Sequence, residues 1–151
     1  MDAETVNRLR RVVGRLARQL NTTSTSEGLT PTQASVLGLI AGRGPLSIAA
    51  LTQLEGLNPT MLSRVISKLD DAGLIRRVPD PADLRTASVE ATADGRAMHD
   101  RIRDRRTAIV SECAGRLDAK DADALTRALP ALEALAEQLQ LTEAPVGRSA
   151  R

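Results

Sequence analysis

The sequence predicts a mainly α-helical fold with a small β hairpin. Two observations predict it. Residues 47–71 have the pattern of a short helix, a tight turn and a second helix with capping signals at its ends. Residues 74–91 follow as two short strands around a charged loop. Together they indicate a winged helix-turn-helix at residues 30–91, with about six helices in the whole chain.

The first helix is expected at residues 2–21, followed by a polar loop at residues 22–28. One side of this helix is apolar: Val6, Leu9, Val12, Val13, Leu16 and Leu20. The other side is basic: Arg8, Arg10, Arg11, Arg15 and Arg18. A capping box at residues 30–33 starts the second helix, and Gly42 and Gly44 mark its end.

The helix-turn-helix is bounded by local chemistry. Ser47 can cap the first of its helices, Gly56 can close that helix with a positive φ, and Asn58 can cap the second. Pro59 suits the first helical position, and Gly73 ends the second helix. The residues expected to face inward on the first helix are Ile48, Ala49, Leu51 and Leu54. Those expected to face inward on the second are Leu62, Val65, Ile66 and Leu69.

The outward face of that second helix carries hydroxyls and cations. Its members are Thr60, Ser63, Arg64, Ser67 and Lys68. Such groups contact base edges and phosphates, although most polar helix faces are only solvated surface. No acid lies between Pro59 and Leu69, while the whole chain has 19 acids against 21 Lys and Arg. We therefore predict that this face binds DNA.

The hairpin provides a second candidate contact. Residues 74–78 form its first strand and residues 86–91 its second. An arginine at the tip, Arg85, can enter the strongly negative minor groove, and Asp83 is placed to orient its guanidinium. The alternative is an exposed surface pair worth less than about 1 kcal/mol.

The string LSRVISKLDDAGLIRRVPDPADLRTASVEATADGRAM resembles the MarR family, the multiple antibiotic resistance regulators. Its marks are the SR pair, the LDDAGLI helix end, and the DPADLR wing followed by TADG. The flanking helices match in order and approximate length, so the resemblance covers residues 1 to about 140.

The resemblance implies an obligate, intertwined homodimer that binds a pseudo-palindromic operator in double-stranded DNA. It implies a repressor released by a small-molecule effector or by thiol oxidation. By position, Ser63 and Arg64 resemble the family's DNA contacts, and Arg85 resembles its minor-groove arginine, steadied by Asp83. Thr86 departs from the many relatives that carry a second basic residue there.

The C-terminal part is expected to be two further helices. Thr92 caps the first, which runs to about Leu117, and four arginines at positions 101, 103, 105 and 106 are expected to be solvated. The last helix starts at Asp118 or Asp121 and carries a leucine stripe, with Pro130 expected to kink or loosen it. The stripe is Leu125, Leu129, Leu132, Leu135 and Leu139. Residues 142–151 are expected to be a disordered tail.

The two ends of the chain have opposite charge. Residues 1–20 carry five arginines and two acids, a net of +3, whereas residues 111–145 carry seven acids and three bases, a net of −4. Apolar stripes on both terminal helices exceed what one small core can absorb. We therefore expect the segments 1–21 and 92–141 to support the module and to form the dimer.

Composition limits the other classes of function. The chain has 42% hydrophobic residues but no run of about 18 apolar residues, and its charged start lacks a signal-peptide core. One cysteine excludes an intrachain disulfide, and we expect a cytoplasmic protein. No Phe, Trp or Tyr is present, so base stacking on aromatic side chains is excluded. Any effector must be held by aliphatic, arginine or hydroxyl groups.

An enzyme is not expected, and neither is a cofactor or metal site. Cys113 and His99 lie fourteen residues apart on one predicted helix, roughly 21 Å at about 1.5 Å per residue, too far for a nucleophile pair. Cys113 is expected to be an inert thiol buried on an apolar stripe. The alternative function is a winged-helix protein-interaction module that has lost DNA binding. Retention of Arg64, Lys68 and Arg85 argues against it.

Overall fold

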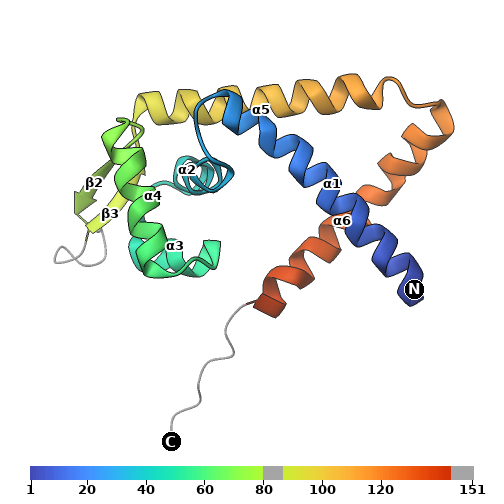
Figure 1. The fold of residues 1–151 in the computed structure, drawn as a ribbon, viewed down its shortest axis with the longest axis horizontal. Helices are drawn as coiled ribbons and strands as arrows, with labels where there is room; N and C mark the ends of the chain where they lie inside the picture. The colour runs from blue at the N-terminus through green and yellow to red at the C-terminus, as the bar shows by residue number, and fades with distance from the viewer. Residues whose placement is uncertain (80–86, 144–151) are drawn as a thin grey trace, which may run out of the picture. The chain divides into compact units, whose positions relative to one another are not determined.

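The computed structural model describes residues 1–79 and 87–143, with side chains as far as residue 139. The predicted fold class is confirmed, since six helices accompany a small antiparallel sheet (Figure 1). In chain order the elements are α1 (Ala3–Ser26), α2 (Pro31–Arg43), β1 (Leu46–Ser47), α3 (Ile48–Glu55), α4 (Pro59–Asp71), β2 (Ile75–Pro79), β3 (Ala87–Ala91), α5 (Ala93–Ala114) and α6 (Ala119–Glu143).

The chain forms two compact units, Met1–Thr107 and Ala108–Arg151. The first holds α1 to α4, the sheet and most of α5; the second holds the end of α5 and α6. None of the helices in the described ranges is long and apolar enough to cross a membrane.

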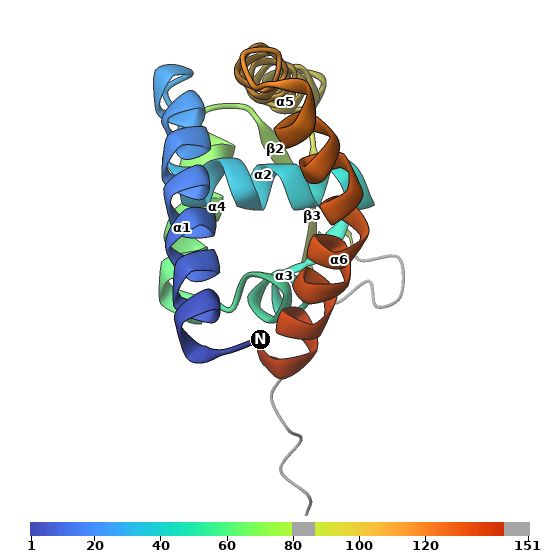
Figure 2. The same cartoon turned by 90° about the vertical axis from the view of Figure 1, so that its right-hand side faces the viewer.

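Helix α2 is the centre of the first unit and contacts α1, α3, α4 and β3 (Figure 2). Its residues Val36, Leu37 and Ile40 are at most 1% exposed. They belong to a continuous apolar core with the inward residues of α3, of α4, of the turn after α4 and of the sheet: Leu51, Leu62, Val65, Ile66, Leu69, Leu74, Ile75 and Val89. Because α4 rests on this core, its opposite face is directed outward.

The predicted caps of α2, α3 and α4 are confirmed. Thr30 and Gln33 form the reciprocal capping box of α2. The Ser47 hydroxyl accepts a hydrogen bond from the Ala50 N–H at 3.2 Å, which starts α3. One expectation for α3 is wrong: Leu51 is fully buried, but Ala49 and Leu54 are exposed. An eight-residue helix packed against α2 and α4 buries a narrower stripe than its apolar pattern suggests.

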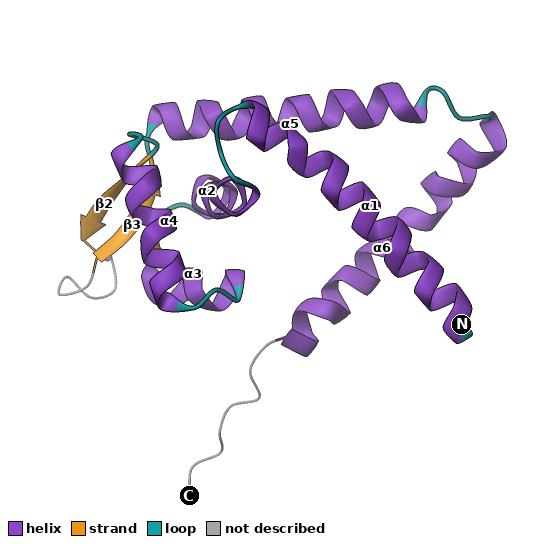
Figure 3. Cartoon of the chain, in the orientation of Figure 1, coloured by secondary structure: helices purple, strands orange, loops and turns teal. Residues whose placement is uncertain are grey.

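The sheet has three strands in the order β1-β3-β2, where the sequence predicted only two. Figure 3 shows β2 and β3, the two strands of the wing, in orange. Strands β2 and β3 pair from Ile75 with Ala91 to Pro79 with Ala87. The two-residue β1 pairs with the outer edge of β3, which places Ser47 opposite Ser88. Ser88 is therefore 1% exposed, and the simple in-out alternation expected for this strand does not hold.

The start of α5 is fixed to the turn after α4. The Thr92 hydroxyl donates a hydrogen bond to the Gly73 carbonyl at 2.6 Å and accepts one from the Gly95 N–H at 3.0 Å. The Thr92 N–H donates to the Leu74 carbonyl at 3.1 Å. Gly95 is buried directly against the Leu74 backbone, so α5 is attached to the segment that joins α4 to β2.

The predicted loop at residues 22–28 is wrong, because α1 continues to Ser26. The hydroxyls of Thr22, Thr23 and Ser24 donate to carbonyls three residues earlier, which accommodates these residues within the helix. Thr23 and Ser24 are also at most 2% exposed. Burial of this end against the rest of the unit outweighs the weak helix propensity of its residues.

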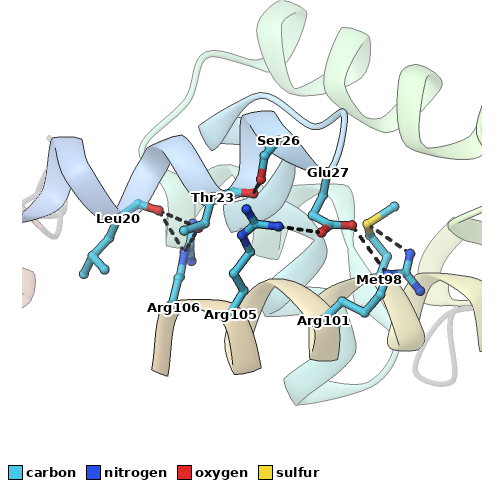
Figure 4. A network of polar contacts seen from close by, with 8 residues as sticks. All are labelled: Leu20, Thr23, Ser26, Glu27, Met98, Arg101, Arg105 and Arg106. Carbon is cyan, nitrogen blue, oxygen red and sulfur yellow. Dashed lines mark hydrogen bonds and ion pairs between the residues drawn. The ribbon is translucent and has the colours of Figure 1, made fainter. Parts of the chain in front are cut away.

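Arginines of α5 hold that end of α1 (Figure 4). The Arg106 Nε donates to the Leu20 carbonyl at 3.3 Å and to the Thr23 hydroxyl at 3.1 Å. Arg101 and Arg105 lie 3.5 and 3.8 Å from the Glu27 carboxylate. The expectation of a solvated arginine face is therefore wrong for Arg106, which is half-buried and joins two helices more than 80 positions apart in the chain. Arg101 and Arg105 remain exposed, at 54% and 55%, beside Glu27.

The second unit also corrects three expectations. Helix α5 ends at Ala114 instead of Leu117, and Cys113 is exposed in the single chain instead of buried. The Asp118 carboxylate caps α6 by accepting from the Asp121 N–H at 2.8 Å. Helix α6 continues through Pro130 to Glu143, so residues 142 and 143 are helical. The rest of the predicted tail lies outside the described residues.

Candidate nucleic-acid interface

The orientation of α4 is fixed at its start and along its inner side. The Asn58 carboxamide oxygen accepts a hydrogen bond from the Met61 N–H at 2.8 Å, and Pro59 occupies the first helical position. The four inward residues predicted from the sequence are all buried, at 9% exposure or less: Leu62, Val65, Ile66 and Leu69. The remaining side chains of α4 must therefore face away from the core.

All five residues predicted for the outward face are exposed and line one shallow hollow along α4: Thr60, Ser63, Arg64, Ser67 and Lys68. Neither Arg64 nor Lys68 forms an ion pair with any residue that the structure describes. The acids nearest in sequence, Asp70 and Asp71, occupy the last two positions of the helix. The hollow thus presents two uncompensated cations among three hydroxyls.

This arrangement suits a nucleic acid. An α-helix fits the major groove of B-form DNA, where guanine offers two acceptors to a bidentate arginine and phosphates lie along both edges. Arg64 can make the bidentate contact, whereas Lys68 supplies a compact charge for a phosphate. The three hydroxyls can donate or accept, so they can pair with either kind of base edge.

The wing adds one free cation in the described part of the hairpin. Arg76 is paired with the Glu90 carboxylate across β2 and β3, and its Nε donates at 2.6 Å. Arg77 is exposed and has no ion-pair partner among the described residues. Asp83 and Arg85 lie outside the described residues, so their assignment to the minor groove stays a prediction.

A second hollow lies between α2 and α5 and was not predicted. Its volume is about 390 Å³, and its lining is mixed: Ala34, Ser35, Gly38, Leu39, His99, Ile102, Arg103, Arg106 and Thr107. In the sequence, His99 stands out only as a possible partner for Cys113. Gly38 is the one sequence signal for this site. The His99 ring packs against it so closely that an added Cβ at residue 38 would lie 3.3 Å from the His99 Cε1 atom.

The residues considered for catalysis are not assembled. His99 and Cys113 both belong to α5, as predicted, and lie fourteen positions apart. Within the described ranges, no group of three or more His, Cys, Asp or Glu residues could hold a metal ion.

Comparisons with known proteins agree with this geometry. A model of the MarR family matches residues 29–87, the segment from the start of α2 to β3. An uncharacterised HTH-type transcriptional regulator of Mycobacterium bovis is 30% identical over 137 residues, which cover 91% of this chain and 96% of that protein.

Solved structures extend the agreement to the fold. A MarR family protein of Mycobacterium tuberculosis has a TM-score of 0.71 and 26% identity, over 88% of this chain and 96% of that one. Wild-type MarR of E. coli has a TM-score of 0.72 and 21% identity, over 87% and 97%. The chain therefore belongs to the MarR family and is a transcriptional regulator, not an enzyme.

Proposed function

We propose that the protein is a sequence-specific repressor that binds a pseudo-palindromic operator in double-stranded DNA as a homodimer. The observation that carries the proposal is the outward face of α4, where Arg64 and Lys68 stand unpaired among hydroxyls on a helix held rigidly by the core. A regulator with this function acts where the chromosome is, which supports the cytoplasm as its location.

Two copies of α4 would enter successive major grooves on one side of the duplex. In two-fold dimers of this class the recognition helices are about 34–36 Å apart, one turn of B-form DNA. Each wing would then lie over the adjacent minor groove, with Arg85 as its predicted contact and Asp83 as its support. Occupying a promoter in this way excludes the polymerase.

The dimer is supported by apolar side chains that one chain leaves uncovered. In α1, four aliphatic residues are 45–59% exposed: Val6, Val12, Val13 and Leu16. In α6, the predicted leucine stripe is 36–59% exposed: Leu125, Leu129, Leu132, Leu135 and Leu139. Stripes of this size normally mark an interface, and the opposite net charges of the two terminal segments suit a pairing of α1 with α6 of a second copy.

Leu16→Glu tests the dimer. Leu16 is 59% exposed in the single chain, so the fold tolerates a polar group there, whereas a buried carboxylate in the interface would not be tolerated. We expect light scattering at micromolar concentration to give the mass of two chains for the wild type and of one chain for the variant. Asn7→Glu, which lies on the arginine side of α1 four residues before Arg11, should stay dimeric. A wild-type mass of 16.1 kDa would contradict the proposed dimer.

The hollow between α2 and α5 is our candidate for the effector site. It combines aliphatic walls with Arg103, Arg106 and two hydroxyls, a set that suits a small organic anion. Arg106 also holds the end of α1, so a ligand drawn to it would compete for the contact between the dimerisation helix and α5. The α4 helices of both subunits must enter the DNA together. A ligand that changed the distance between them would therefore release the operator.

Release of DNA by small carboxylic acids tests this site. We expect at least one aliphatic or aromatic acid in a panel to lower the affinity of the wild type for its operator about tenfold. Such a change requires the acid to bind the DNA-free protein about tenfold more tightly than the DNA-bound protein. Arg103→Ala should lose most of the response and retain DNA binding, because the ion-pair partners of Arg103 among the described residues are the exposed Asp100 and Asp104. An equal response in both proteins would place the effector elsewhere.

Selection from randomised duplexes tests the function as a whole. The proposed dimer should enrich an inverted repeat whose half-sites are centred about ten base pairs apart. Failure to enrich any motif would contradict sequence-specific binding and would favour the alternative of a protein-interaction module.

A further inference from the structure

We infer that Met61 contacts the 5-methyl group of a thymine in the major groove and so fixes one base pair of each half-site. The inference rests on the proposed function and adds to it a residue outside the polar set of the outward face. It is an apolar contact on a surface otherwise made of cations and hydroxyls.

Exposed apolar residues are confined to a few places. Among the described residues from 21 to 107, only Leu54 and Met61 are large hydrophobic residues with exposed side chains, at 42% and 50%. Apart from the terminal Met1, the other exposed ones among the described residues lie in α1 or beyond Thr107, where the proposed dimer would cover them. Met61 is not needed in the core, because the four inward residues of α4 are already buried without it. Its exposure is therefore left unexplained by folding or by the dimer.

The position of Met61 in α4 directs it to the DNA. It is the third residue of the helix, and its N–H is held by the Asn58 cap at 2.8 Å. Arg64 and Lys68 follow at spacings of three and seven, so they lie on the same side of the helix, one and two turns further on. The N-terminal residues of a recognition helix are those that meet base edges in the groove. Met61 is thus the residue nearest the N-terminus of α4 on the side of the helix that also carries Arg64 and Lys68.

The chemistry selects one occupant. In the major groove the thymine methyl is the apolar group presented by a base pair; the other bases present donors and acceptors. The thioether side chain is unbranched and polarizable, so it can fit against a methyl group without demanding one exact geometry. Burial of one methyl contributes enough to change affinity about fourfold, and two half-sites together change it about fifteenfold.

Deoxyuridine substitution tests the inference, because it removes only the methyl group. The duplex enriched by selection is synthesised with each symmetric pair of thymines replaced in turn, and Kd is measured for the wild type and three variants. We expect one replacement to weaken wild-type binding about fifteenfold. Met61→Gln should bind the two duplexes equally, whereas Met61→Leu should keep most of the difference. Leu54→Gln should keep the full difference, because the first helix of such a motif crosses the backbone.

The outcomes separate the inference from the proposed function. Tight binding of the selected duplex with no effect of any thymine replacement would overturn the inference alone, and so would an unchanged thymine preference in Met61→Gln. A chain that enriches no duplex would overturn the proposed function and the inference with it. Unfolding midpoints of the variants, compared with the wild type, show that each is folded when its affinity is measured.

Discussion

Gly95→Ala should lower the free energy of unfolding by about 3 kcal/mol, the largest single effect we expect in the N-terminal unit. A Cβ at this position would overlap the Leu74 carbonyl oxygen and lie 2.8 Å from the carbonyl carbon. Both atoms are backbone, so no side chain can rotate to make room. Relief requires α5 to move away from the turn that joins α4 to β2, which also breaks the hydrogen bonds of Thr92.

Gly42→Ala is the matched control. Gly42 lies in α2 with no atom within 4 Å of an added Cβ, and its φ is not positive. The same substitution there should raise stability by about 0.5–1 kcal/mol, the helical preference of alanine over glycine. Both variants are compared by urea unfolding at one protein concentration, since the stability of a dimer depends on it. A Gly95→Ala midpoint equal to that of the wild type would show that the close packing described here is wrong.

Arg64→Ala should weaken binding to the selected operator by about 1–3 kcal/mol for each recognition helix, because a bidentate base contact is lost. The guanidinium has no partner among the described residues, so its removal breaks no ion pair in that part of the chain. The fold should therefore keep its stability. Affinity for scrambled duplex should fall much less, since that binding depends on phosphate charge.

The ratio of the two affinities distinguishes a base contact from a phosphate contact. Arg8→Ala removes an equal charge from the exposed surface of α1 and should leave the ratio unchanged. If Arg64→Ala weakens binding to operator and scrambled duplex by the same factor, Arg64 contacts phosphate and its assignment to a base is wrong.

Local signals in the sequence are sufficient for much of the fold. The capping box at Thr30, the cap and proline at residues 58–59, and the glycine that follows each helix of the motif place α2, α3 and α4 correctly. Where prediction failed, a distant partner decides the structure. The end of α1 is buried against the rest of the unit, and Arg106, more than 80 residues away, donates hydrogen bonds to Leu20 and Thr23 there. Strand β1 has two residues and exists only through its pairing with β3.

The site divides in the same way. Helical spacing was enough to group the five polar residues of the outward face, because the inward stripe of α4 is unambiguous. It could not identify Met61, since an apolar residue beside an apolar stripe is normally part of the core. It could not identify the hollow between α2 and α5 either, because that site combines residues more than 60 positions apart. Met61 and this hollow are recognised only from side-chain exposure and packing, which the spacing of apolar residues in the sequence does not give.

The central claim is sequence-specific binding of duplex DNA, and one titration tests it most directly. Labelled selected duplex and a scrambled duplex of equal composition are titrated with the protein across a salt series, and anisotropy gives Kd. The label belongs on the DNA because the chain has no tryptophan. We predict affinity for the selected duplex at least about a thousandfold above scrambled at physiological salt, falling as salt rises. Equal affinity for both duplexes at every salt concentration would contradict the account.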